Sequence, residues 1–149
     1  MAVSTYAAQY SQAEITSCPD IVSALGQIVR RFSAAGGAIH VLDSDGLLHL
    51  AASEGVPEGL REALRTLPVG KGISGQAVER RQAVSGSMQM EGTSEALAMP
   101  IFRGDAVIGA LAIGSATDRT FTEAEMDSLM EAGRAIGTSF LGSLQSSAA

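Results

Sequence analysis

The sequence predicts an α+β fold in which helices cover both faces of an antiparallel sheet. Two pairs of short, β-prone apolar runs are each joined by a tight turn, which is the pattern of a β-hairpin. Segments with an apolar face at helical spacing precede and follow these hairpins. Because the runs are apolar at nearly every position, we expect the sheet to be buried on both faces.

The N-terminal part of the chain is predicted to contain two helices. Residues 4–16 carry a weak apolar stripe, which favours a short helix. Residues 18–34 carry a stronger stripe, in which Ser17 can cap the first turn and Asp20 lies at its positive end. The pair Gly36-Gly37 is expected to end this second helix.

The first predicted hairpin joins residues 38–42 to residues 47–51. One position of its turn would place His40 opposite His49, which raises a metal site as an alternative, whereas a turn one residue later would not. No third ligand stands at a readable spacing in the sequence. Packed or hydrogen-bonded histidines are therefore expected, and no metal.

Two short helices are expected between the hairpins. Residues 57–67 form the first, which Pro68 ends, and residues 73–81 form the second. Residues 82–86 favour a brief strand. The polar, methionine-containing residues 87–94 are predicted to form the longest loop within the domain.

Residues 70–75 match the pattern GxGxxG of a dinucleotide-binding turn. Their context argues against that function, because Pro68 stands where a parallel strand would have to end and the helix that follows is short. Lys71 is followed by glycine rather than Ser or Thr, so a P-loop is also excluded. The helix start could still bind an anion with help from Lys71. The alternative is that the glycines only turn the chain and Lys71 is solvated.

The second predicted hairpin joins residues 96–102 to residues 106–114. Its second strand is almost wholly apolar, which predicts a central position in the sheet. Pro100 lacks an amide donor, so it suggests a strand start, an edge or a bulge.

The last element is predicted to be a long helix that begins after Thr122 and reaches about Leu144. Thr122 and Glu125 form a capping box, and Phe121 and Met126 are placed to form a hydrophobic staple. An apolar stripe runs along the helix, and its two glycines allow a neighbour to approach closely. We predict that this stripe is a dimer interface, made of Met126, Leu129, Gly133, Ile136, Gly137 and Phe140.

Composition limits the class of protein. The 149 residues are 46% hydrophobic and carry a net charge of −6, which suits one compact domain over residues 1–149 with a loose tail at 145–149. The acidic balance disfavours nucleic acid and anionic membrane surfaces as partners. The single cysteine, Cys18, cannot form an intramolecular disulfide. No secretory signal or membrane-spanning run is visible, so a cytoplasmic location is expected.

Three segments in this order resemble the GAF domain family over about residues 20–140: GAIHVLDSDGLLHLAASEG, LPVGKGISGQAVERRQAV and ALAMPIFRGDAVIGALAIGSATDRTFTEAEMDSLMEAGRAIG. The resemblance implies a GAF/PAS-like antiparallel sheet of five to six strands, with the N- and C-terminal helices on one face. It places the short helices and a loop over a pocket on the other face. Family members commonly sense small molecules and often dimerise through their terminal helices.

The resemblance also implies which residues bind a ligand, without specifying the ligand or any cofactor. They come from the helix start after Pro68, the loop over the pocket mouth and the strand beyond it: Lys71, Gly72, Ile73, Ser74, Ser87, Met88, Met90, Thr93 and Met99. Flexible methionine side chains suit an adaptable apolar site, although they can equally fill core.

The chain also departs from several members of the family that it resembles. It has no convincing counterpart of the Asn-Lys-Phe-Asp-Glu set of cyclic-nucleotide binders, and the place of Cys18 argues against covalent bilin attachment. Free methionine-(R)-sulfoxide reductases need several cysteines, and one thiol cannot both attack and resolve. No catalytic residue is assigned, so we predict that the chain is not an enzyme.

The prediction from sequence is a small-molecule sensor that signals as a homodimer, with a signalling protein as a further partner. The alternative is a ligand-free dimerisation or protein-docking module, in which the chain's own Met and Leu side chains fill the pocket. An enzyme is the third interpretation.

Overall fold

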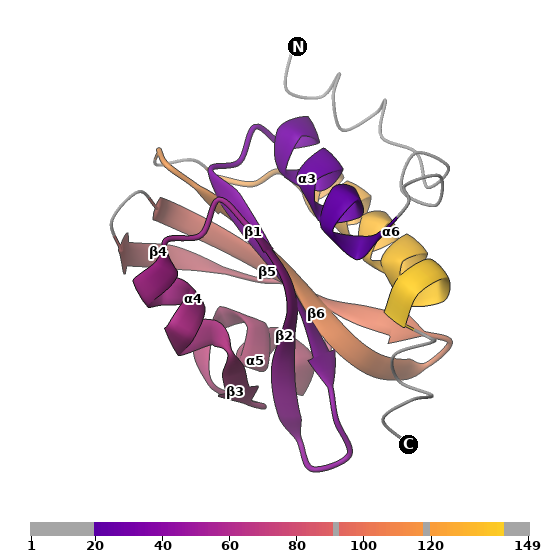
Figure 1. Ribbon diagram of the computed structural model, residues 1–149. Coiled ribbons are helices and arrows are strands. Elements are labelled where there is room, and N and C mark those ends of the chain that lie inside the picture. Colours follow the sequence, from indigo (N-terminus) through magenta and orange to yellow (C-terminus); the bar gives the residue numbers. More distant parts are fainter. Residues whose placement is uncertain (1–19, 91–92, 118–119, 142–149) are drawn as a thin grey trace.

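The computed structural model describes residues 20–90, 93–117 and 120–141, and the side chains of 87–90 and 93 fall outside this description. A six-stranded sheet separates two layers of helices (Figure 1). All neighbouring strands are antiparallel, in the order β3-β2-β1-β6-β5-β4. The strands are β1 (Gly36–Leu42), β2 (Leu47–Glu54), β3 (Thr66–Pro68), β4 (Val84–Met90), β5 (Thr93–Arg103) and β6 (Ala106–Ser115).

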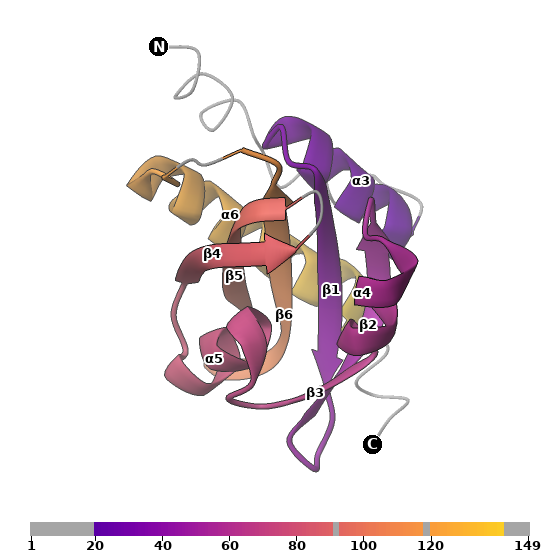
Figure 2. The same cartoon turned by 90° about the vertical axis from the view of Figure 1, so that its left-hand side faces the viewer.

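The helices divide between the two faces of the sheet. Helices α3 (Ile21–Arg31) and α6 (Glu123–Ile136) lie side by side on one face, and a short π-helical segment, η1 (Gly137–Leu141), continues α6. Helices α4 (Glu58–Leu64) and α5 (Gly72–Arg80) lie on the other face (Figure 2). This arrangement confirms the predicted α+β fold. The predicted helix at 4–16 and the tail at 145–149 lie outside the described residues.

Helix α3 begins and ends at other residues than the sequence suggested. Asp20 is its N-cap, because its extended backbone lets the carboxylate accept a hydrogen bond of 2.8 Å from the amide of Ser23. Ser17, the expected cap, lies outside the described residues. The helix ends at Arg31 because Ser33 has a φ of +52°, so the chain turns before Gly36-Gly37, which already belong to β1.

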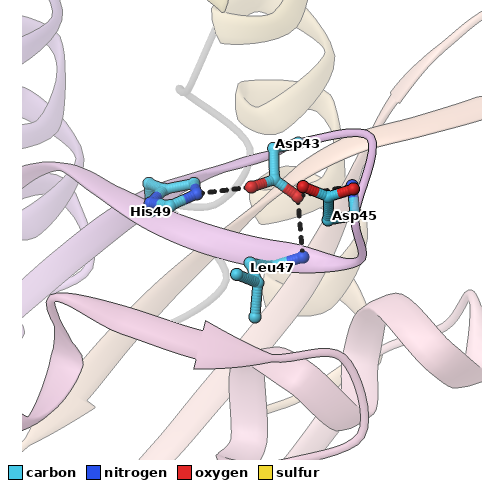
Figure 3. Close-up of polar contacts among 4 residues, drawn as sticks. All are labelled: Asp43, Asp45, Leu47 and His49. Atoms are coloured by element: carbon cyan, nitrogen blue, oxygen red, sulfur yellow. Dashed lines mark hydrogen bonds and ion pairs between the residues drawn. The ribbon is translucent and has the colours of Figure 1, made fainter.

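A hydrogen-bonded turn joins β1 to β2. The Asp43 carboxylate accepts hydrogen bonds from the amides of Asp45 (2.8 Å) and Leu47 (2.9 Å), and its other oxygen lies 2.6 Å from His49 Nε2 (Figure 3). The hydrogen bond from His49 is the main cause of a lowered Asp43 pKa. The resulting register pairs Val41 with His49. It differs from the registers of both turn positions that the sequence analysis considered, so His49 does not stand opposite His40. In the described residues no group of three His, Cys, Asp or Glu side chains could hold a metal ion.

The segment between the hairpins differs from the prediction at two places. The expected helix at 57–67 stops at Leu64, and Thr66–Pro68 is strand β3, because Leu67 pairs with Leu48 on β2. The expected loop at 87–94 is mostly paired, since β4 and β5 form a hairpin with an irregular register between Ser87 and Met90. Backbone hydrogen bonds hold this edge of the sheet, so its sequence needs no apolar alternation.

Residues 70–75 form a turn into α5 and not part of a parallel βαβ unit, as the antiparallel pairing shows. A Cβ atom at Gly75 would lie 2.7 Å from the Pro68 carbonyl oxygen, so the glycine is needed for close approach to β3. Pro100 lies in β5, where pairing with β4 has already ended at Ala98, and a register shift follows at Ile101. The expected edge or bulge at Pro100 is thus found.

The main core lies between the sheet and the α3–α6 layer. The predicted capping box of α6 is present, with Thr122 and Glu125 exchanging bonds of 2.9 and 3.1 Å. Four residues of the predicted dimer stripe are buried in this core, so they offer no surface to a second copy: Leu129, Gly133, Ile136 and Gly137. The other two, Met126 and Phe140, are half-buried at the edge of the core. No helix of the described residues is long and apolar enough to cross a membrane.

Candidate functional site

A cavity of about 150 Å³ lies on the face of the sheet that α4 and α5 cover. Strands β1 and β6 form its floor, and α4, β3, the first turn of α5 and the loop residues 55–57 form its walls. Small residues on β1 and β6 leave the space free, because Ala38 and Ala112 pair directly across the two strands. The cavity is therefore built from two parts of the chain, residues 36–74 and 112–114.

The lining of the cavity is mainly apolar. Helix α4 contributes Leu60 and Leu64, and β3 contributes Leu67. None of the residues of α4 is buried, so the helix contacts the rest of the domain chiefly through these half-exposed leucines. Among the described residues the lining contains no Lys, Arg, Asp or Glu, and its polar side chains are His40 and Ser74.

His40 is the buried polar group of this site. It lies on β1, it has no solvent-accessible surface, and its Nε2 atom lies 2.8 Å from the carbonyl oxygen of Leu64. A carbonyl oxygen only accepts, so Nε2 carries the proton and Nδ1 is left with a free lone pair. Nδ1 is buried and has no hydrogen-bond partner in the part of the chain that the structure describes. Burial is the main reason that the pKa of His40 is lowered, with the nearby His49 adding to the effect and the Leu64 carbonyl opposing it.

The lowered pKa of His40 predicts that the protein loses stability in mild acid. Below pH 6.5, the ordinary value, the unfolded chain takes up a proton that the folded state resists, so the free energy of unfolding falls as the pH drops. The slope is at most about 1.4 kcal/mol per pH unit. Urea unfolding of the wild type between pH 7.5 and 5 measures it, and a His40→Gln variant should lack this slope.

A His49→Gln variant is the matched control for this titration, because His49 is exposed on β2 and does not line the cavity. It should retain the slope of the wild type over the same pH range. Asp20 and Asp43 have lowered pKa values, and the stability that they contribute is lost mainly below pH 3.8, which is outside this range. A slope that disappears in His49→Gln and persists in His40→Gln would show that burial of His40 is not its cause.

The comparisons with known proteins agree with the fold described above. A family model described as a GAF domain matches residues 16–140. The chain belongs to the GAF domain family. A search of curated proteins finds no match.

Three solved structures illustrate the range of proteins that share this GAF fold. The GAF domain of an Acinetobacter phosphoenolpyruvate-protein phosphotransferase is 18% identical with a TM-score of 0.77, covering 96% of this chain and 95% of that one. A free methionine-R-sulfoxide reductase from Neisseria meningitidis, in complex with its substrate, is 20% identical with a TM-score of 0.74, covering 98% and 94%. The reduced form of fRMsr from Staphylococcus aureus is 19% identical with a TM-score of 0.67, covering 91% and 94%.

The prediction that the chain is not an enzyme, which rested on its single cysteine and the lack of an assigned catalytic residue, is wrong. Solved structures with this fold include free methionine-R-sulfoxide reductases, which are enzymes, beside GAF domains of other proteins. At 20% identity or less the likeness shows the fold alone, so belonging to the GAF family does not separate the two kinds of protein.

Part of the predicted ligand site lines the cavity of this GAF domain. Gly72, Ile73 and Ser74 line the cavity at the first turn of α5, as expected. Lys71, the N-cap of that helix, is exposed and does not line it. Met99 belongs to the main core on the opposite side of the sheet. The side chains of Ser87, Met88, Met90 and Thr93 lie outside the described residues.

Sequence reasoning missed most of the cavity lining. Val56, Leu60, Leu64 and Leu67 come from a loop, a helix and a strand whose meeting is a tertiary property. His40 was singled out for a different kind of site. Its position two residues after Ala38 on one strand places both on the same face, and this is the signal that could have assigned it to the cavity.

Proposed function

We propose that this GAF domain binds a small molecule in the cavity beneath α4 and α5 and that the bound state regulates a protein partner. The observation that carries the proposal is the cavity itself, an apolar space of about 150 Å³ with a buried polar group in its wall. A cavity of about this size in an engineered protein core holds benzene. Its mainly apolar lining, with few polar groups, is typical of small-molecule sites.

Strand β1 supports the regulatory part of the proposal, because its residues alternate between the cavity and the main core. Ala38 and His40 line the cavity, and Ile39 between them is buried in the core that contains α3. A ligand that moves β1 therefore also moves the packing of α3. We propose that a homodimer or a signalling partner senses this change at the outer helices. The half-buried Met126 and Phe140 are the predicted residues that a second copy could contact.

An Ala112→Phe variant tests the binding function by filling the cavity. Ala112 lies on β6 in the cavity lining, so a phenyl ring there occupies the space that a ligand needs. We expect toluene to raise the thermal midpoint of the wild-type chain and to leave the midpoint of Ala112→Phe unchanged. Native mass spectrometry of both proteins, purified gently from cells, should show retained small molecules on the wild type alone.

The matched control is Ala63→Phe, which adds the same ring at an exposed position of α4 that does not line the cavity. This variant should respond to toluene as the wild type does. Equal responses of wild type and Ala112→Phe, or no response and no added mass for the wild type, would contradict binding in this cavity. The latter result would favour the alternative of a ligand-free docking module.

A further inference from the structure

We propose that His40 selects the ligand of this cavity: the site takes an uncharged, mainly apolar molecule that donates one hydrogen bond to His40 Nδ1. The proposal rests on the proposed function and names the chemical class of its ligand. Suitable donors are a hydroxyl, an amide or a heteroaromatic N–H group.

The hydrogen-bonding state of His40 carries the first step. The Leu64 carbonyl accepts from Nε2–H at 2.8 Å, which fixes the tautomer and makes Nδ1 an acceptor. Among the described residues Nδ1 has no hydrogen-bond partner, and a buried polar atom without one costs stability comparable to a lost hydrogen bond. His40 lines the cavity but has no solvent-accessible surface, so a donor reaches Nδ1 only when the ligand displaces the side chains that close over it. A ligand that donates to Nδ1 removes this cost, whereas a ligand that presents only an acceptor there meets a second lone pair.

The charges around the cavity carry the second step. The described lining has no Lys or Arg side chain to neutralise a carboxylate or a phosphate, and it has no Asp or Glu side chain to neutralise a cation. An ion would therefore lose its hydration with no charged side chain of the described lining to compensate it. Burial lowers the pKa of His40, so the imidazole does not serve as the missing positive charge. Lys71, which the sequence offered as an anion partner, is exposed and outside the lining.

The same imidazole connects the ligand to α4. Leu64 is the last residue of this helix, and its carbonyl is held by the ring whose other nitrogen would bind the ligand. Donation to Nδ1 polarises the ring and strengthens the bond from Nε2–H to Leu64, because hydrogen bonds in a chain reinforce one another. Ligands with the donor should therefore hold α4 against the sheet more firmly than ligands of the same shape without it.

Phenol and toluene test this selection, because they have nearly the same shape and differ by a hydroxyl donor in place of a methyl group. Dissociation constants of both for the full chain are measured by NMR titration. In the wild type, the 15N resonance of His40 Nδ1 should move upfield with phenol and stay in place with toluene. This measurement needs no variant and reports directly on the acceptor atom.

A His40→Leu variant then removes the acceptor, and with it the donor to the Leu64 carbonyl, because leucine has no polar side-chain atom. We expect the ratio of the toluene to the phenol dissociation constant to fall by about tenfold, the effect of one hydrogen bond of ordinary strength. The matched control is His49→Leu, the same change at the exposed histidine on β2, which should keep the wild-type ratio.

The possible failures are distinct. If both probes bind but the Nδ1 resonance does not respond to phenol and the ratio is the same in His40→Leu, then selection by His40 is overturned and binding in the cavity stands. If Ser74→Ala lowers the ratio and His40→Leu does not, then Ser74 is the selecting group and the proposal is overturned as well. If neither probe binds the wild type, the proposed function fails and this inference fails with it.

Discussion

Replacement of Gly109 by alanine is expected to lower the free energy of unfolding by about 3 kcal/mol, the range in which overpacking disrupts a core. Gly109 lies on β6 between β1 and β5. A Cβ atom there would overlap the backbone carbonyl oxygen of His40 and approach Leu141 Cδ1 at 3.2 Å. A backbone atom in the middle of a sheet cannot move aside as a flexible side chain can, so the strands must separate locally.

Gly59→Ala is the matched control for this prediction, since it makes the same change where nothing lies within 4 Å of the new Cβ atom. Gly59 is exposed on α4, and alanine should stabilise the helix there by about 0.5–1 kcal/mol. Urea unfolding followed by far-UV circular dichroism measures both effects. Equal stabilities of Gly109→Ala and the wild type would mean that β1 and β6 are not as close as described at this point.

Gly133→Leu is expected to destabilise the single protomer by about 3 kcal/mol, because a large side chain is forced into a filled core. The Cβ position at Gly133 already lies 3.6 Å from Ile101 Cγ1 and 3.9 Å from Leu111 Cδ2, both on the sheet. These are ordinary contacts for a methyl group, so Gly133→Ala should be neutral or should gain up to about 1 kcal/mol from helix propensity. Only the outer carbons of leucine lack room.

Urea unfolding and the solution mass of each Gly133 variant distinguish packing within the protomer from pairing between helices. The structure predicts that Gly133→Leu loses stability at any protein concentration, since its neighbours are Ile101 and Leu111 of the same chain. The opposite result is a dimer that dissociates into monomers of unchanged stability. That result would assign the glycine stripe of α6 to a helix pair, as the sequence suggested.

The local signals in the sequence were the most reliable ones. The hairpin turn at 43–46, the start of α5 and the capping box of Thr122 and Glu125 are each decided by a few adjacent residues, and all are present. Strand β3 has only three residues and pairs through its backbone, so no periodicity indicates it. No periodicity indicates the end of β4 at the edge of the sheet either.

The face on which a residue lies was harder to predict than its element. A sheet that is covered on both sides has apolar residues on both faces, so alternation does not say which face a side chain takes. Met99 was assigned to the pocket and lies in the main core, and Gly133 was assigned to an interface and lies against β5 and β6. The space that Ala38 and Ala112 leave free can be recognised only when the pairing of β1 with β6 is known.

The two faces of the sheet differ in what they bury. The large core that provides most of the burial lies with α3 and α6, whereas the cavity lies with α4 and α5 and is bordered by a helix that buries none of its residues. Substitutions at the wall residues of α4 therefore leave the main core unchanged. Under the proposed function, changes at Leu60, Leu64 or Ile73, none of which is buried, would alter the ligand that fits the cavity while the main core stays as it is.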